Sequence, residues 1–123
     1  MKSMILLGMI LLVGLITGCY KDIVLPPDPN APPQDVSFSG DLQPIFTSKC
    51  ATSSCHDGAH KPLLTEGNSY NALMTGGYVN TNIPTESTLY KVLNSGSMPP
   101  TGKLPSAEIQ MVLDWIKIGA PNN

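Results

Sequence analysis

Hydrophobic side chains recur every three to four residues in four segments of this chain, and this periodicity predicts four helices. The last helix is the most regular, because Ile109, Val112 and Ile116 repeat on one helical face. The predicted helices cover approximately residues 39–49, 68–75, 86–94 and 105–119.

Residues that typically begin or end helices support these limits. Pro44 is expected near the start of the first helix, because proline has no amide hydrogen and is tolerated in a first turn. Asn68 is a suitable N-cap for the second helix, and Gly76-Gly77 is expected to end it. Gly119 is expected to end the fourth helix.

Strand signals are weak, since only residues 77–80 could be extended and no sheet follows from one such segment. Long loops are expected at residues 57–67 and 95–105, and loops of this length often carry a binding site. The sequence therefore predicts a mostly α domain of about four helices with long loops.

The first eighteen residues have the pattern of a targeting segment. Lys2 provides a positive end, and residues 4–16 are an uninterrupted run of apolar residues and glycine, shorter than the roughly 20 residues that span a bilayer. The segment Leu15-Ile16-Thr17-Gly18-Cys19 resembles the lipobox of bacterial lipoproteins. This resemblance implies a signal peptide at residues 1–18, cleavage before Cys19 and lipid attachment to its thiol. An ordinary secretory signal with an unrelated cysteine is the alternative.

A proline-rich stretch follows, so residues 19–36 are expected to form a lipidated tether and residues 37–123 the folded domain. The five prolines forbid a helix and favour an extended polyproline conformation, with a reach on the order of 50 Å. The tether would leave the domain free to swing. The protein is expected at the bacterial cell envelope, lipid-anchored on the periplasmic side of a membrane or on the outer-membrane surface.

The charge balance excludes one class of partner. Without residues 1–18, six lysines face nine acidic residues, and the chain has no arginine. Such a chain offers no basic patch for nucleic acid.

The strongest chemical signal is the segment KCATSSCHDG at residues 49–58. Cys50 and Cys55 could form a disulfide in an exported protein, but a disulfide gives no reason for His56 to follow directly. Covalent haem gives that reason, because two cysteine sulfurs attach the porphyrin and the histidine after the second one binds the iron.

Zinc is the other metal that this segment could bind, with Cys50, Cys55, His56 and His60 as four ligands. Directly adjacent ligands are awkward for a tetrahedral site, whose ligands usually come from separated positions. His60 is otherwise expected to be a solvated loop residue.

A haem iron needs a second axial ligand, and Met98, in a loop rich in glycine and proline, is the candidate. A thioether opposite an imidazole raises the reduction potential. Met74 and Met111 lie within predicted helices and are expected to pack in the core. Trp115 and Tyr90 could line a haem pocket or belong to the core of a small domain.

Together these features resemble the small mono-haem c-type cytochromes, in particular their lipoprotein and planctomycete-type domains. Residues 38–46 look like the helix that leads into the haem cysteines, and residues 104–120 look like the closing helix. The resemblance covers roughly residues 37–121. One departure is the spacing, because four residues rather than the usual two separate Cys50 from Cys55.

The resemblance implies a small cytochrome c-like fold wrapped around one covalent haem c. Cys50 and Cys55 would attach the porphyrin, and His56 and Met98 would bind the iron from opposite faces. With both axial positions filled, the protein is expected to be an electron carrier and not an enzyme, with redox proteins as partners. The alternative is an exported lipoprotein that serves as a binding or scaffold module, with a structural zinc site or a disulfide.

Overall fold

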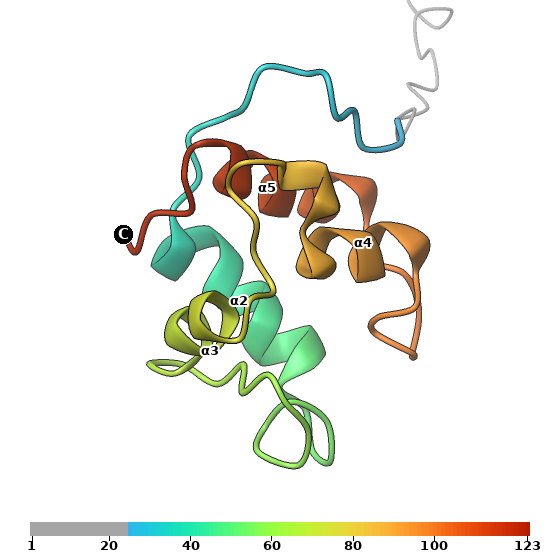
Figure 1. The fold of residues 1–123 in the computed structure, drawn as a ribbon. Helices are drawn as coiled ribbons and strands as arrows, with labels where there is room; N and C mark the ends of the chain where they lie inside the picture. The colour runs from blue at the N-terminus through green and yellow to red at the C-terminus, as the bar shows by residue number, and fades with distance from the viewer. Residues whose placement is uncertain (1–24) are drawn as a thin grey trace, which may run out of the picture.

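A computed structural model describes residues 25–123, and this part of the chain folds into short helices joined by long loops, without a β-strand (Figure 1). The prediction of a mostly α fold is confirmed for these residues. The expected targeting segment at residues 1–18 and the expected lipidation of Cys19 lie outside the described residues. Among residues 25–123, no helix has the length and apolar character needed to cross a membrane.

The first helical segment is continuous and consists of η2 (Phe38–Leu42), α2 (Gln43–Ile45) and η3 (Phe46–Cys50). The segments η2 and η3 are π-helices, in which the amide of Gln43, for example, donates to the carbonyl of Phe38. Pro44 is the second residue of α2 and so lies near a helix start, as predicted, but the continuous helical segment already begins at Phe38. The wider π turns accommodate a residue that has no amide hydrogen and whose ring crowds the preceding turn.

The remaining helices are α3 (Ser69–Thr75), the 3₁₀-helix η4 (Pro84–Glu86), α4 (Thr88–Ser95) and α5 (Ser106–Lys117). The predicted second, third and fourth helices are confirmed to within two residues at each end. The third begins later than predicted, because the 3₁₀ turn precedes it. Gly96 ends α4 in the left-handed conformation with φ of 78°, which a residue without a Cβ adopts easily. Residues 77–80 form no strand.

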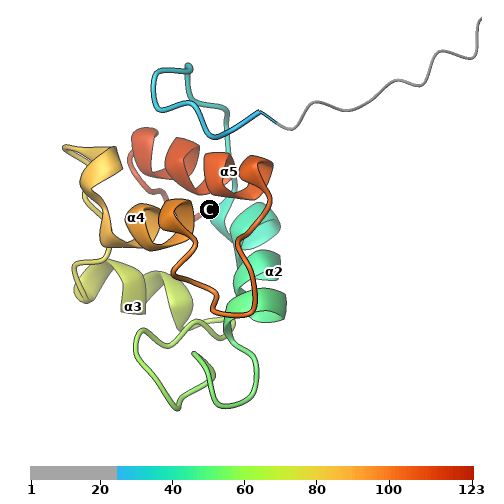
Figure 2. The ribbon, with the colours of Figure 1, turned by 90° about the vertical axis from the view of Figure 1, so that its right-hand side faces the viewer.

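Helix α5 is the centre of the hydrophobic core. Figure 2 shows α5 above α4, with α2 at one side and α3 below. The Trp115 ring is fully buried and packs on Phe38, with ring centroids 5.2 Å apart. Its indole nitrogen donates to the carbonyl of Pro121 at 2.9 Å, which fixes the chain beyond the helix. The α5 side chains with no exposed surface are Ile109, Val112, Leu113, Trp115 and Ile116.

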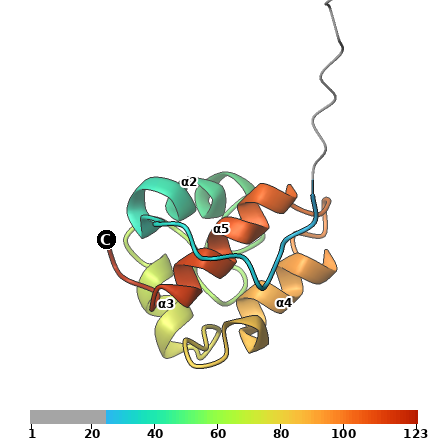
Figure 3. The same cartoon turned by 90° about the horizontal axis from the view of Figure 1, so that it is seen from above.

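The described part of the proline-rich segment, residues 25–36, runs over α5 (Figure 3). The amide of Asp28 donates to Gln110 Oε1 at 2.7 Å, and Lys117 Nζ donates to the carbonyl of Ala31 at 2.8 Å. Residues 28–31 form a turn, in which the amide of Ala31 donates to the carbonyl of Asp28 at 3.3 Å, and the contacts with Gln110 and Lys117 hold this turn against α5. The expectation of a freely swinging tether is therefore wrong for these residues.

Candidate functional site

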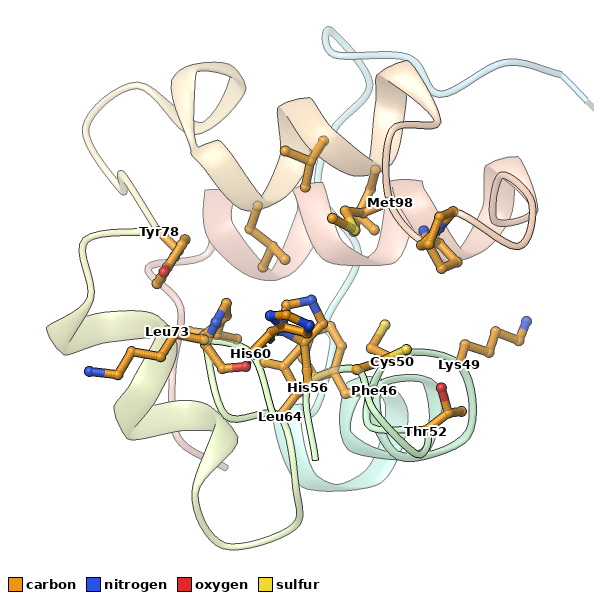
Figure 4. A pocket seen from close by; sticks show the side chains of 18 of the residues that line it. Phe46, Lys49, Cys50, Thr52, His56, His60, Leu64, Leu73, Tyr78 and Met98 are labelled. Carbon is orange, nitrogen blue, oxygen red and sulfur yellow. Dashed lines mark hydrogen bonds between the residues drawn. The ribbon is translucent and has the colours of Figure 1, made fainter. Parts of the chain in front are cut away.

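A cavity of about 560 Å³ lies between the C-terminal end of the first helical segment, α4 and the loops that follow each of them (Figure 4). Its volume is within the range of roughly 300–1,000 Å³ that is usual for small-molecule and cofactor sites. The two long loops predicted from the sequence, at residues 57–67 and 95–105, both contribute to it. The fold thus brings together segments that are about forty residues apart in the sequence.

The walls of the cavity are mostly apolar. Among the described residues that line it are two lysines, Lys49 and Lys61, and no acidic residue, although acidic residues outnumber lysines in the chain. Such a lining suits a largely apolar ligand that carries negatively charged groups. The apolar and aromatic side chains of the wall include Phe46, Leu64, Leu73, Tyr78, Leu89, Val92 and Leu93.

The His56 imidazole is half-buried, lines the cavity and has one ring nitrogen already engaged. Its Nδ1 lies 2.9 Å from the carbonyl oxygen of Pro62, which can only accept a hydrogen bond, so Nδ1 carries the proton. Neutral imidazole then has its free electron pair on Nε2. Histidines that bind metals usually donate their other ring N–H to a carbonyl or carboxylate in this manner. The hydrogen bond therefore leaves Nε2 as the ring nitrogen of His56 that is free to accept a hydrogen bond or to hold a metal ion.

The loop that carries His56, residues 51–68, is fixed to the first helical segment by a buried polar pair. Leu64 donates its amide to the carbonyl of His56 at 2.9 Å, and its own carbonyl accepts from Gln43 Nε2 at 3.2 Å. Gln43 Oε1 in turn accepts a hydrogen bond from the hydroxyl of Ser69. Because Gln43 and Ser69 are both buried, these bonds are shielded from water and hold the loop in register with the helix.

Cys50 and Cys55 both line the cavity as free thiols, so the disulfide alternative is not realised in this structure. Cys50 is the last residue of η3 and is buried, whereas Cys55 lies on the loop and is half-buried. The pKa of the Cys50 thiol is raised from 9.0 to about 11, mainly by burial and also by the negative charge of Glu108, while Lys49 acts in the opposite direction. The Cys50 thiol therefore stays protonated at neutral pH.

Met98 lies on the other side of the cavity. Figure 4 shows its side chain opposite His56 and Cys50, on the loop that follows α4. Its amide donates to the carbonyl of Val92 at 3.1 Å, and 41% of the residue is exposed. Since the Met98 thioether is not enclosed by the core, it remains free to contact a molecule or metal ion bound in the cavity. Met74 and Met111, by contrast, pack against the core, as predicted.

The four zinc candidates do not assemble into a site. Across residues 25–123, no three histidine, cysteine, aspartate or glutamate side chains come together in a way that could hold a metal ion. His60 is exposed, as predicted, and Figure 4 shows it on the same side of the cavity as His56. The arrangement thus favours ligands from opposite sides of the cavity over a local cluster.

Of the two alternatives that the sequence left open for Tyr90 and Trp115, the structure confirms the core and not the cavity. Tyr90 and Trp115 are buried in the core and do not line the cavity, where Phe46 and Tyr78 lie instead. The position of Phe46 could have been inferred, because it precedes Cys50 by one helical turn and therefore shares its face. No sequence signal identified Tyr78 or the carbonyl of Pro62, since both reach the site only through tertiary packing.

Comparisons with protein-family models, with curated proteins and with solved structures found no match to this chain. The chemistry of the residues around the cavity is therefore the basis for a functional hypothesis.

Proposed function

We propose that this chain is a mono-haem cytochrome c, with a cytochrome c-like fold, that transfers electrons between redox proteins. The observation that carries the proposal is the hydrogen bond from His56 Nδ1 to the carbonyl of Pro62, at 2.9 Å, beside a mostly apolar cavity. In metal-binding histidines a bond of this kind orients the ring and makes the other nitrogen more basic.

The residues around the cavity fit a haem in chemical type. Cys50 and Cys55 would form the two thioethers, His56 Nε2 would bind the iron, and Met98 would bind it from the other side of the cavity. The apolar walls suit the porphyrin ring, and Lys61, whose ammonium group has no acidic partner among the salt bridges of the described residues, suits one of its carboxylates. A bound haem would supply one-electron exchange at its iron.

The role of the protein follows from the number of iron positions that His56 and Met98 would fill. With His56 and Met98 both on the iron, no position would remain for a substrate, so an electron carrier fits better than an enzyme. The work of the chain is then to bury the cofactor, hold its ligands and set its potential. The half-exposed Met98 loop would leave one edge of the cofactor accessible to redox partners.

The experiment is a visible absorption spectrum of the full chain, produced in a bacterial host that matures c-type haem. We expect sharp α and β bands after reduction with dithionite. We also expect haem that stays on the chain through acid-acetone extraction, and a pyridine haemochrome whose band position reports one thioether or two. A colourless protein from a competent host, or one that carries stoichiometric zinc, would exclude the proposal.

A matched pair of variants tests the assignment of the axial histidine. His56→Ala should abolish stable haem incorporation or change the spectrum to that of an iron with a missing ligand. His60→Ala, four residues further along the same loop and exposed, should leave the spectrum unchanged. Equal loss of haem in both variants would contradict the role of the bond between His56 and Pro62.

We further propose that Cys19 carries a lipid and that the protein is held at the bacterial cell envelope. The support is the lipobox-like segment before Cys19 and the apolar run that precedes it. Lipidation would raise the effective concentration of the domain near redox partners at a membrane. A Cys19→Ala protein should leave the membrane fraction and remain red, and a variant that still sediments with membranes would exclude the anchor.

A further inference from the structure

An ion pair between distant parts of the chain lies beside the cavity. Lys49, in the last turn of η3, places Nζ 2.5 Å from Oε1 of Glu108, in the first turn of α5. The side chain of Glu108 is 20% exposed and that of Lys49 is 37% exposed. The pair is thus partly shielded from water, and its members attract one another more strongly than fully exposed groups do.

The second oxygen of this carboxylate has no hydrogen-bond partner. Glu108 Oε2 is buried, and of all the buried side-chain oxygen and nitrogen atoms in residues 25–123 it alone lacks a partner. A buried carboxylate without full hydrogen bonding keeps more of its negative field than a solvated one does. Lys49 compensates for only part of that field, since its side chain is more exposed than that of Glu108 and water screens its charge more strongly.

The field of Glu108 reaches Cys50. The neighbouring residue Lys49 contacts Glu108 directly, and the carboxylate raises the pKa of the Cys50 thiol, after the larger effect of burial. Cys50 lines the cavity, and it is one of the two residues that would attach the porphyrin. A fixed negative charge therefore lies close to the point where the cofactor would join the chain.

We propose that Glu108 sets the reduction potential of the cofactor, acting from beside Cys50 as a buried negative charge that Lys49 only partly neutralises. This inference rests on the proposed haem site. Acceptance of one electron from a donor protein would make the cofactor more negative by one charge. A nearby carboxylate disfavours that change, so it lowers the potential, and a nearby ammonium group raises it. Glu108 would thus offset part of the rise that methionine ligation gives.

The chain provides a matched control. Lys91 and Glu86 form a second lysine–glutamate pair with an Nζ–Oε2 distance of 2.8 Å, but their side chains are 54% and 58% exposed, and neither lines the cavity. The two pairs share their chemistry and differ in burial and position. Solvent and salt screen the exposed pair far more strongly.

The experiment is a redox titration of the haem-loaded full chain with four substitutions in separate proteins. Glu108→Gln should raise the midpoint potential and Lys49→Met should lower it, whereas Glu86→Gln and Lys91→Met should leave it near the wild-type value. The Glu108→Gln shift should persist at high salt. If the Glu108→Gln and Lys49→Met proteins have the same potential as the Glu86→Gln protein, the inference is overturned.

A second readout does not need the cofactor. In the unloaded full chain, urea unfolding of Glu108→Gln, Lys49→Met and the double variant should give a larger coupling between these two residues than the same cycle gives for Glu86 and Lys91, because the first pair is better shielded from water. If the two couplings are equal, Glu108 is screened as an exposed carboxylate is and the inference fails, whatever the protein's colour. A chain that never retains haem excludes the proposed function and this inference together, whereas a red Glu108→Gln protein with an unchanged potential excludes only the inference.

Discussion

Nδ1 of His56 lies 2.9 Å from the carbonyl oxygen of Pro62, six residues further along the same loop. This contact gives the imidazole one tautomer and one orientation, with Nε2 as the free nitrogen. It links a motif that is visible in the sequence to a geometry that only the folded loop provides.

Met98→Ala tests the sixth ligand. We expect the variant to keep its covalent haem, to lose the weak long-wavelength charge-transfer band of the oxidised protein, and to have a lower reduction potential, because the thioether favours ferrous iron. In the unloaded chain the substitution should cost about 0.5 kcal/mol or less of unfolding free energy, since the side chain is 41% exposed. Visible spectra, potentiometry and urea titration measure the three quantities.

Met111→Ala is the control for that variant. Met111 packs against the core and does not line the cavity, so its loss should cost roughly 1–3 kcal/mol and leave the charge-transfer band intact. A band that disappears in both variants, or that survives Met98→Ala, would show that Met98 is not the ligand.

Gln43→Leu should loosen the loop of residues 51–68. The change leaves the buried hydroxyl of Ser69 and the carbonyl of Leu64 without their partner, which costs about 1–3 kcal/mol of unfolding free energy. Ser69→Ala in the same chain should recover part of that cost, because it removes one unpaired group. Urea unfolding of the two single variants and the double variant measures the coupling, and strictly additive costs would contradict a shared network.

The two cavity cysteines should react differently in the unloaded full chain. Cys55 is half-buried and Cys50 is buried with a pKa of about 11, so alkylation at pH 8 should modify Cys55 first. The rate at Cys50 should rise as the pH approaches 11. Mass spectrometry of the alkylated peptides measures both rates, and a Cys50 that reacts as fast as Cys55 at pH 8 would contradict the buried position.

The Cys50 thiol also makes the free energy of unfolding depend on pH. The pKa of Cys50 is about 11 in the folded chain and about 9 in an unfolded chain, so the folded state keeps its proton over this interval. Stability from this group is therefore fully present below pH 9 and declines as the pH rises towards 11. Urea unfolding of the unloaded chain and of Cys50→Ala across this range should show a decline that is smaller in the variant.

Lys117→Met should release the proline-rich segment from α5. The substitution removes the contact with the carbonyl of Ala31, and we expect faster cleavage by a non-specific protease within residues 25–36. Unfolding free energy should change by about 0.5 kcal/mol or less, because the contact is peripheral. Lys91→Met, on α4, should leave the cleavage rate unchanged. If the wild type, Lys117→Met and Lys91→Met are cleaved at the same rate within residues 25–36, the contact of Lys117 does not hold the segment.

The sequence by itself determined the helical class and the positions of three of the helices. In α5 the spacing of Ile109, Val112 and Ile116 is a strong local signal, since burial of one helical face requires that period. The motif of Cys50, Cys55 and His56 was also legible, because the chemistry that it predicts depends on residues adjacent in the chain.

Tertiary structure decided what local patterns do not specify. The first helical segment continues through Pro44 because it contains π turns, and the hydrophobic periodicity of the sequence does not predict π turns. Three contacts of side chains with groups elsewhere in the chain depend on tertiary packing and have no signal in the sequence. They join His56 to Pro62, Lys49 to Glu108, and Lys117 to the proline-rich segment. The same holds for the aromatic side chains. Trp115 and Tyr90 lie in the core, whereas Phe46 and Tyr78 line the cavity. An aromatic side chain suits either environment, so only the arrangement of the helices determines where it lies.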